Sequence, residues 1–551
     1  MVQTQRKFSY DAAKVLLLIV ITSFVYGNTI DNQFVFDDSR IYLNPNIRLT
    51  SLDFQSVAAA WRNIEPKTRP LANLSFALNY YFHQDEVRGY RLVNIAIHAI
   101  TGIFLFLLVR TTLNLPGLRS RYGAYGWLPF VAALVWLVHP VQTQSVSYTV
   151  QRMNSLAAMF YVIALFAYIQ GRLAAGWRRK LSLFGCAAGS GLFSLWSKEI
   201  ALTLPFFMIL YDWYFLRDLA TGWLKKYGFW AGCGLGLLGL AAFFFYLGTA
   251  PLDALLAGYG HRDFTLGERL FTEARVVVFY LSLLILPLPG RLNLDHHFLI
   301  SRSWLDPTNT ALSLLALVLL ATLVVYLARR HRLLSFGIIW FLGNLAIEST
   351  VVPLELVFDH RLFLPSMMLI VALAAFVREQ LPDNYAAPAA AVVMVLLLSF
   401  WTFQRNQVWA GPITLWDDCA AKSPDKARVH SNFGVALKRA GRLAEAEGRF
   451  RKTVELDPSF FEAYNNLGNI MIIRGRLAEA ESFYRQALAV KPDNPVLHVN
   501  LGNALMDMWR LEEARGHYRK AMLLQPGYRE ARTSFFRVNR LIKAREEGVG
   551  R

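Results

Sequence analysis

Residues 461–494 read FEAYNNLGNIMIIRGRLAEAESFYRQALAVKPDN, and units of this length and pattern follow one another at 427–460, 461–494 and 495–528. Two residue types return at intervals of 34: glycine at Gly434, Gly468 and Gly502, and proline at Pro458, Pro492 and Pro526. A small residue lets two helices approach closely, and a proline ends the second helix of a pair. The repeat therefore predicts an α-solenoid over 427–528, closed by a capping helix and tail over 529–551.

A 34-residue period with glycine in the first helix, alanine and an aromatic residue in the second, and proline at the end is the signature of the tetratricopeptide repeat. Asparagines recur in the same register, on the first helix of each repeat: Asn432, Asn466 and Asn500, with Asn469 and Asn503 about one turn further on. Such amides could be packing contacts. Because each amide also donates and accepts, a row of them could bind an extended peptide backbone, and we expect a groove for a protein partner.

The rest of the chain has the composition of a membrane protein. Of 551 residues, 55% are hydrophobic, 14% aromatic and 17% charged, and the mean hydropathy is +0.32. The formal net charge is +18, but many lysines and arginines flank apolar segments, which favours membrane lipids over nucleic acid as partners. The three cysteines are isolated and form no disulfide framework or metal-binding spacing. We predict an all-α protein, with a polytopic membrane bundle over 1–404, a linker over 405–426 and the soluble repeats.

Eleven segments are long and apolar enough to cross about 30 Å of hydrocarbon. They are 12–30, 91–109, 127–147, 153–170, 181–197, 200–216, 228–248, 308–328, 333–352, 362–377 and 386–403. The lysines and arginines of the short connectors fall on one side if the N-terminus is cytoplasmic. The first outer loop, 31–90, and everything after 404 would then lie outside.

One further apolar segment, 274–289, breaks this count. A full crossing there would put the basic cluster at 329–332 on the wrong side of the membrane. We therefore expect a re-entrant or interfacial helix, ended by Pro287 and Pro289. A twelve-span arrangement is the alternative, and it would move the tail to the cytoplasm.

The first outer loop begins with FVFDDSRIYLNPN, residues 34–46, directly after the first span. Its adjacent Asp37 and Asp38 could be a helix cap and a solvated loop residue. They would also suit a general base or metal ligand that faces a membrane-embedded substrate. Other unusual polar residues fall at the same outer ends of the spans: Arg69, His139, Gln142, Arg152, Lys198, Glu199, His296, His360 and Arg361. Their convergence on one membrane face indicates an active site.

The cationic residues of this set could be interfacial anchors, but an arginine fork also suits a phosphate. His296, between Asp295 and His297, could ligate a divalent metal, although no ligand spacing is diagnostic and we predict no metal site. No nucleotide-binding motif occurs in a supporting context. An activated donor used at the outer face would therefore have to be lipid-linked.

The ordered motifs resemble one known family. The series is FVFDD with a following Asn-Pro, RPLANLSFALNY at 69–80, HPVQTQSVSY at 139–148, QR at 151–152, SKE at 197–199, HRLFLPS at 360–366, and the terminal repeats. It is similar to the transmembrane and tetratricopeptide-repeat protein O-mannosyltransferases and their bacterial relatives, in the GT-C superfamily of polytopic glycosyltransferases. The resemblance covers nearly the whole chain.

The resemblance implies a polyprenyl- or dolichyl-phosphate sugar donor, an acidic catalytic base in the first outer loop, and repeats on the lumenal or periplasmic side. Asp38 would be the base, with Asp37 positioning it or sharing the role. The donor phosphate would be contacted by Arg361, Arg152, Lys198 and His360, although His360 replaces a glutamate that we associate with this motif. Only three clear repeats imply a short acceptor groove, and the short loops would fit a bacterial member in the inner membrane.

We therefore expect an integral-membrane, metal-independent glycosyltransferase that needs no cofactor. It would move a hexose such as mannose from a polyprenyl-phosphate donor to Ser or Thr hydroxyls of exported proteins held by the repeats. One alternative is an enzyme that acts on a lipid or a cell-surface glycan. Another is a non-enzymatic membrane-anchored scaffold. A lipid flippase would need polar groups through the depth of the bundle, whereas the mid-span positions are nearly all apolar.

Overall fold

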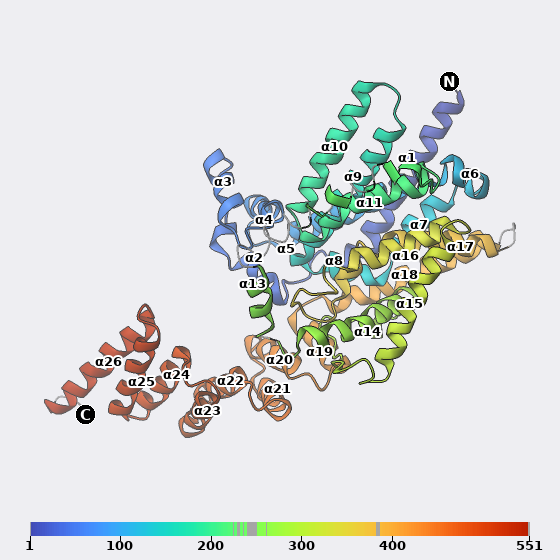
Figure 1. Cartoon of the computed structure of the whole chain (residues 1–551). Helices are drawn as coiled ribbons and strands as arrows, with labels where there is room; N and C mark the ends of the chain where they lie inside the picture. Colours follow the sequence, from blue (N-terminus) through green and yellow to red (C-terminus); the bar gives the residue numbers. More distant parts are fainter. Residues whose placement is uncertain are drawn as a thin grey trace. The chain divides into compact units, whose positions relative to one another are not determined.

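The computed structural model describes residues 2–548, except 224, 227, 229–231, 235, 238, 240–250, 261 and 382–385. Within these residues every regular element is a helix (Figure 1), which confirms the predicted all-α class. The chain divides into two compact units, residues 1–411 and 412–551. Each unit is described by itself.

The first unit contains long helices and shorter connecting ones. The long helices are α1 (Val2–Tyr26), α5 (Val87–Leu113), α9 (Arg152–Leu173), α10 (Trp177–Leu195), α14 (Leu266–Ile285), α15 (Asn309–Leu327), α16 (Arg332–Leu345), α17 (Ser366–Gln380) and α18 (Ala386–Val408). The shorter helices are α2 (Ser39–Tyr42), α3 (Phe54–Asn63), α4 (Pro70–His83), α6 (Pro116–Tyr122), α7 (Leu128–Leu137), α8 (Thr143–Ser147), α11 (Leu204–Tyr211) and α13 (Pro251–Tyr259).

Several of these helices can cross a membrane by length and composition. Six do so among the described residues: Tyr10–Thr29, Val87–Leu113, Thr149–Leu173, Glu199–Leu216, Asn309–Leu327 and Ala386–Val408. Two shorter apolar helices, Leu128–Leu137 and Arg332–Leu345, accompany them. The predicted span 228–248 falls largely outside the described residues. The total of eleven spans stays a prediction.

The predicted span 127–147 is wrong as a single helix. Helix α7 ends at Leu137, and the chain continues through a 3₁₀ turn, Pro140–Gln142, into the short helix α8. Proline cannot continue a helix because it lacks the backbone N–H and clashes with the preceding turn. The residues that follow Pro140 are polar and buried, so they lie inside the protein instead of facing lipid.

The apolar core of the first unit lies among α1, α5, α7, α9, α14, α16 and α17. Two fully buried tryptophans join these helices to the start of α17: the indole N–H of Trp340 donates to Leu364 O at 2.9 Å, and that of Trp136 to Ser366 Oγ at 3.1 Å. Helices α15 and α18 are different, because only 17% of each apolar window is buried. Their exposed apolar surfaces are suited to contact with lipid.

The second unit is a row of helices: α19 (Pro412–Lys422), α20 (Ala427–Arg439), α21 (Leu443–Leu456), α22 (Phe461–Ile473), α23 (Leu477–Val490), α24 (Pro495–Asp507), α25 (Leu511–Leu524) and α26 (Arg529–Glu546). The repeat glycines lie where the paired helices meet. A Cβ added at Gly434, Gly468 or Gly502 would stand 2.7, 2.5 or 2.7 Å from the ring of Phe450, Tyr484 or Tyr518. The segment expected as a linker, 405–426, contains the end of α18 and all of α19, which packs against α20.

Candidate active site

Residues 142–154, here called the hub segment, join the separate motifs of the first unit. The segment follows the break in α7 and consists of short helical turns and the start of α9. His139 fixes its beginning: Nδ1 accepts from the Val141 N–H at 3.4 Å, and Nε2 donates to Leu284 O at 3.1 Å. Gln142 Nε2 donates to Ser366 Oγ at 3.1 Å. These two predicted site residues therefore hold the hub segment against α14 and α17.

One end of the hub segment receives the paired aspartates. Asp38 is fully buried; its Oδ1 accepts from the Val150 N–H at 2.7 Å and its Oδ2 from the Val35 N–H at 3.0 Å. Burial raises the pKa of the Asp38 carboxyl to about 6, against the opposing effects of the Arg91 charge and these hydrogen bonds. The carboxylate therefore fastens the outer loop to the hub segment.

Asp37 lies in a different environment. Its side chain is 34% exposed, with Oδ1 3.4 Å from Arg40 Nε, and its backbone N–H donates to Tyr148 Oη at 3.0 Å. The preceding residue, Phe36, has a φ of 46°, a left-handed conformation that is unusual for a bulky residue. Such strain concentrates at functional sites. The outer loop therefore directs one carboxylate inward and leaves its neighbour accessible.

Arg152 was expected to contact a phosphate, but its guanidinium is fully buried and engaged within the protein. Nε donates to Asn94 Oδ1 at 2.7 Å, Nη2 to Tyr90 O at 2.9 Å and Nη1 to Ser75 O at 3.2 Å. The guanidinium also lies over the Phe76 ring, with Cζ 4.6 Å from the ring centroid. These contacts join α9 to α4 and α5 beside the aspartates.

The hub segment also holds the predicted His360 motif. Gln144 Oε1 accepts from the His360 N–H at 2.6 Å, and Asn154 Nδ2 donates to His360 O at 2.8 Å. Lys198 Nζ donates to Asn154 Oδ1 at 3.1 Å and to Glu348 Oε1 at 2.7 Å, and this ion pair is buried. Burial, with the charges of Lys198 and Arg361, lowers the pKa of His360 well below its usual value, so the imidazole is neutral.

Arg361 lies in a buried charge network that joins three segments. Its Nη1 and Nη2 donate to Leu356 O and Glu355 O at 2.9 and 2.5 Å, and Nη1 lies 3.9 Å from Glu273 Oε1. Glu273 Oε1 is also 2.9 Å from Arg269 Nη2. Arg269 in turn donates at 2.5–2.8 Å to three carbonyls, those of Glu348, Thr350 and Leu354.

Three predicted site residues, Arg69, Glu199 and His296, form ion pairs at the edge of this network. Arg69 and Glu199 form a two-point ion pair, Nη2–Oε1 2.6 Å and Nε–Oε2 3.1 Å, with side chains 22% and 23% exposed. His296 Nε2 lies 3.0 Å from Asp359 Oδ1. In the part of the chain that the structure describes, no group of three or more His, Cys, Asp or Glu residues could hold a metal ion.

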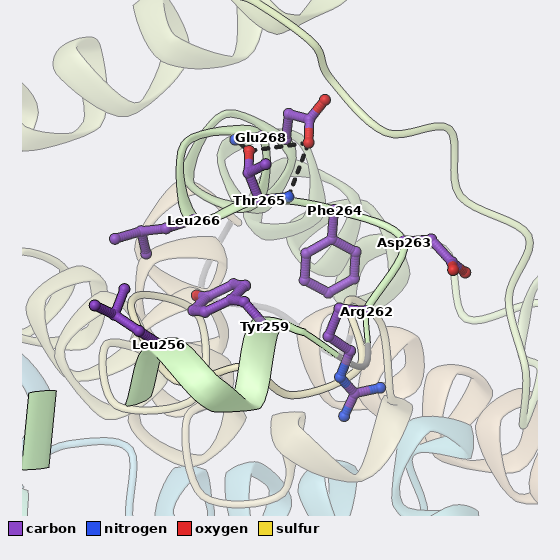
Figure 2. Close-up of a pocket in the computed structure, with 8 residues that line it drawn as sticks. All are labelled: Leu256, Tyr259, Arg262, Asp263, Phe264, Thr265, Leu266 and Glu268. Atoms are coloured by element: carbon purple, nitrogen blue, oxygen red, sulfur yellow. Dashed lines mark hydrogen bonds between the residues drawn. The ribbon is translucent and has the colours of Figure 1, made fainter. Parts of the chain in front are cut away.

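A cavity of about 510 Å³ lies between α13 and the start of α14, beside residues 353–355 (Figure 2). Its lining is mainly apolar, with Leu256, Tyr259 and Phe264 among the side chains shown. Arg262, also in the lining, donates to Glu355 Oε1 at 2.6 Å and to Pro353 O at 2.9 Å. The cavity therefore adjoins the backbone segment that holds Arg361.

Sequence reasoning missed several residues that the fold brings to these contacts: Arg91, Gln144, Asn154, Arg269 and Glu273. Arg91 is fully buried and donates to Gln33 O at 2.7 Å. An ionisable residue inside an apolar helix is a signal that could have identified Arg91. Asn154 and Gln144 carry no comparable signal, because buried amides are recognisable only by their partners.

The repeat asparagines do not all share one environment. Asn466 Oδ1 accepts from Lys438 Nζ at 2.5 Å, and Asn500 Nδ2 donates to Asn465 Oδ1 at 2.8 Å, so these two face the neighbouring first helices. Asn469 Oδ1 and Asn503 Oδ1 instead accept from Tyr484 Oη and Tyr518 Oη, both at 2.7 Å, within their own repeats. Asn432 is half-buried on α20. The row that continues from repeat to repeat therefore contains Asn466 and Asn500, and Asn432 occupies the equivalent position of the first repeat.

Comparison with known proteins supports both units. Tetratricopeptide repeat models match residues 432–495 and 471–533. A Caenorhabditis elegans protein named protein O-mannosyl-transferase is 26% identical over 464 residues, which is 81% of this chain and 63% of that protein. Protein O-mannosyl-transferase Tmtc3 of Drosophila melanogaster is 25% identical over 80% of this chain and 55% of its own length. Protein O-mannosyl-transferase TMTC1 of Homo sapiens is 24% identical over 82% of this chain and 56% of its own length. The chain thus spans between 55% and 63% of the length of these three relatives.

Proposed function

The chain is a homologue of the transmembrane and tetratricopeptide-repeat protein O-mannosyl-transferases, and from this premise we propose that it is a membrane-embedded protein O-glycosyltransferase. The donor would be a hexose, such as mannose, linked to a polyprenyl phosphate, and the acceptor a Ser or Thr hydroxyl of an exported protein. The observation that carries the proposal is the hub segment, which gathers the outer-loop aspartates and the His360–Arg361 motif in one place.

Asp37 is the better candidate for the general base. A base must come within hydrogen-bond distance of the hydroxyl that it deprotonates. The 34% exposure of Asp37 allows this approach, whereas both oxygens of the buried Asp38 already accept backbone N–H groups. We therefore propose Asp37 as the base in place of Asp38, which the family resemblance favoured, and we propose that Asp38 positions it.

The buried charge network is suited to the donor phosphate. Five cationic residues and four glutamates make up the linked pairs: Arg69, Lys198, Arg262, Arg269 and Arg361 with Glu199, Glu273, Glu348 and Glu355. Arginine guanidinium forks and lysine ammonium groups are the side chains that proteins commonly use to bind phosphate. Arg69 is the accessible end of this network, and Arg361 and Lys198 lie deeper. Arg152, whose donors are engaged, would have a structural role only.

In the proposed reaction the acceptor oxygen attacks the anomeric carbon of the sugar as Asp37 takes its proton. The bond between that carbon and the phosphate oxygen breaks, and both electrons leave with the polyprenyl phosphate. Attack from the face opposite the phosphate inverts the anomeric centre. The cations of the network offset the charge that develops on the departing phosphate, and no cofactor is needed.

The acceptor polypeptide would be held by the repeats, through the amides of Asn432, Asn466 and Asn500. The distribution of lysine and arginine supports an outer location for the repeats, and the short loops support a bacterial inner membrane. Orientation and membrane both belong to the proposal.

The direct test is transfer of labelled mannose from a polyprenyl-phosphate donor to a peptide rich in Ser and Thr, with the purified chain in detergent. We expect label on the peptide and its loss in Asp37→Asn. Label in the lipid fraction but not on the peptide would instead assign the enzyme to a lipid or glycan acceptor. No labelling of either acceptor would remove the transferase proposal.

A further inference from the structure

Positions 441, 475 and 509 are equivalent, because they lie 34 residues apart in the turn between the two helices of successive repeats. The backbone is left-handed at all three, with φ of 77° at Gly441, 72° at Gly475 and 59° at Trp509. Glycine adopts this conformation without steric cost, but a bulky residue rarely does. The third repeat therefore has a tryptophan at the position where the first two repeats have the glycine that this turn favours.

The tryptophan gains no burial in return, since its side chain is 64% exposed. The turn is nevertheless fixed by its neighbour: Arg510 Nη1 lies 2.5 Å from Glu481 Oε2 on α23, and Nη2 2.6 Å from Glu513 Oε2 on α25. A strained conformation that the surroundings hold in place is characteristic of functional positions. The exposed indole is thus presented in a defined place.

Other apolar side chains lie at the same ends of the first helices of repeats two and three. They are Ile472, Ile473, Met506 and Met508, and together with Trp509 they are called the rim patch. Ile473 is 61% exposed, and Ile472, Met506 and Met508 are half-buried. Methionine side chains are flexible and polarisable, so a surface that contains them accepts apolar groups of different shapes. In the first repeat the corresponding positions of the helix are Lys438 and Arg439.

The rim patch meets the row of amides at Ile473. Ile473 follows Asn466 by seven residues on α22, whereas Met506, six residues after Asn500 on α24, lies about a third of a turn away from the face of Asn500. Residues seven apart lie on one face of a helix, two turns from each other. A polypeptide whose backbone bonded the amides could therefore place a side chain against Ile473, at the edge of the rim patch. The occupant that matches both features is an extended polypeptide with an apolar side chain.

We propose that Trp509 and the rim patch form a docking surface for an apolar side chain of an extended polypeptide bound along Asn432, Asn466 and Asn500. This inference rests on the proposed function for the role of that polypeptide as acceptor. It goes further because it assigns the groove a preference for peptides with an apolar side chain. Amides that bond only the peptide backbone would give no preference for sequence.

The test uses the full chain in detergent, without donor, and two fluorescein-labelled peptides of twelve residues. Both consist of Gly, Ser and Thr, with Leu at the seventh position of one and Asp at that position of the other. Fluorescence anisotropy should show that the wild type binds the Leu peptide about tenfold more tightly. Trp509→Gly, which copies the two sister turns, should abolish the preference without lowering the unfolding temperature of the repeats.

Leu523→Ser is the matched control, because Leu523 is 72% exposed on the second helix of the same repeat, outside the rim patch. It should keep the Leu preference. Equal binding of the two peptides by the wild type, or a preference that survives in Trp509→Gly, would overturn the proposal. A fall in particle mass with Trp509→Gly would assign the surface to a second copy of the chain and also overturn it. Because no donor is present, failure of sugar transfer leaves this result unaffected.

Discussion

Asp37 and Asp38 show how adjacent residues of one type can be given different roles by their surroundings. The inner carboxylate replaces water with two backbone N–H groups and becomes part of the fold, and the outer one stays accessible to a substrate. A sequence pattern cannot distinguish them, because burial is a property of the folded chain. Their different environments lead to two predictions.

Asp37→Asn should lower sugar transfer by about 10²-fold or more, because the amide cannot accept the hydroxyl proton. Its melting temperature should stay near that of the wild type, since the side chain is 34% exposed and its ion pair with Arg40 lies at the surface. Transfer rates and melting temperatures of Asp37→Asn and Asp38→Asn, measured side by side, test this. Asp38→Asn should lower the melting temperature more than Asp37→Asn does. Full activity in Asp37→Asn would reject Asp37 as the base.

The pH dependence of stability should report on Asp38. Its pKa rises from 3.8 to about 6 on folding, so between about pH 4 and pH 6 the folded protein keeps a proton that the unfolded chain releases. Stability from this group is therefore present at low pH and falls as pH rises, by about 3 kcal/mol at about 1.4 kcal/mol per pKa unit. Melting curves over this range should show the fall in the wild type and not in Asp38→Asn. Parallel curves would contradict the prediction.

At the scale of elements, the segment 348–361 depends on buried arginines for its shape. Arg269 satisfies three of its carbonyls and pairs with Glu273, all without exposure to solvent. Arg269→Met should cost about 3–5 kcal/mol, because it leaves a buried carboxylate and three carbonyls without their donor. Thermal unfolding in detergent measures the loss.

Arg262→Met is the control for this change. Its ion pair with Glu355 is about a quarter exposed, so its loss should cost about 1 kcal/mol or less. Similar melting temperatures for the two variants would mean that the buried network does not hold the segment.

The repeat helices provide a second prediction at this scale. An alanine at Gly468 would place its Cβ 2.5 Å from the Tyr484 ring, so Gly468→Ala should destabilise the repeats by about 1–3 kcal/mol. Gly516 lies on α25 with nothing within 4 Å of an added Cβ. Gly516→Ala should stabilise the repeats by up to about 1 kcal/mol, because glycine is a poor helix former. The temperature at which a protease begins to cleave the repeats of the full chain should fall for the first variant and rise for the second.

At the scale of the whole molecule, we propose that the first unit catalyses sugar transfer and that the second unit binds the acceptor. A chain ending at Gly411 should keep hydrolysis of the donor but lose transfer to protein. The boundary matters: Asn406 accepts from Ser147 Oγ at 2.8 Å and donates to Val25 O at 3.0 Å, and Trp409 stacks on Tyr148. A chain ending at Arg405 should therefore lose donor hydrolysis as well. Full protein labelling by the chain ending at Gly411 would separate the repeats from acceptor binding.

The sequence by itself determined the all-α class, the repeats and the apolar character of the first unit, because periodicity and composition are local properties. It also predicted a site that contains Asp37–Asp38 and His360–Arg361, because these are charged or polar groups out of place at membrane boundaries, and that site stays a prediction. It misjudged the helix over 127–147, where buried polar side chains find partners far along the chain. Only the tertiary structure decided which aspartate is accessible, that Arg152 is engaged internally, and that Arg269 and Glu273 belong with Arg361. The physical reason is distance in sequence: Asp38 is buried by a bond to Val150, 112 residues away, and burial decides whether a polar group binds a substrate or stabilises the fold.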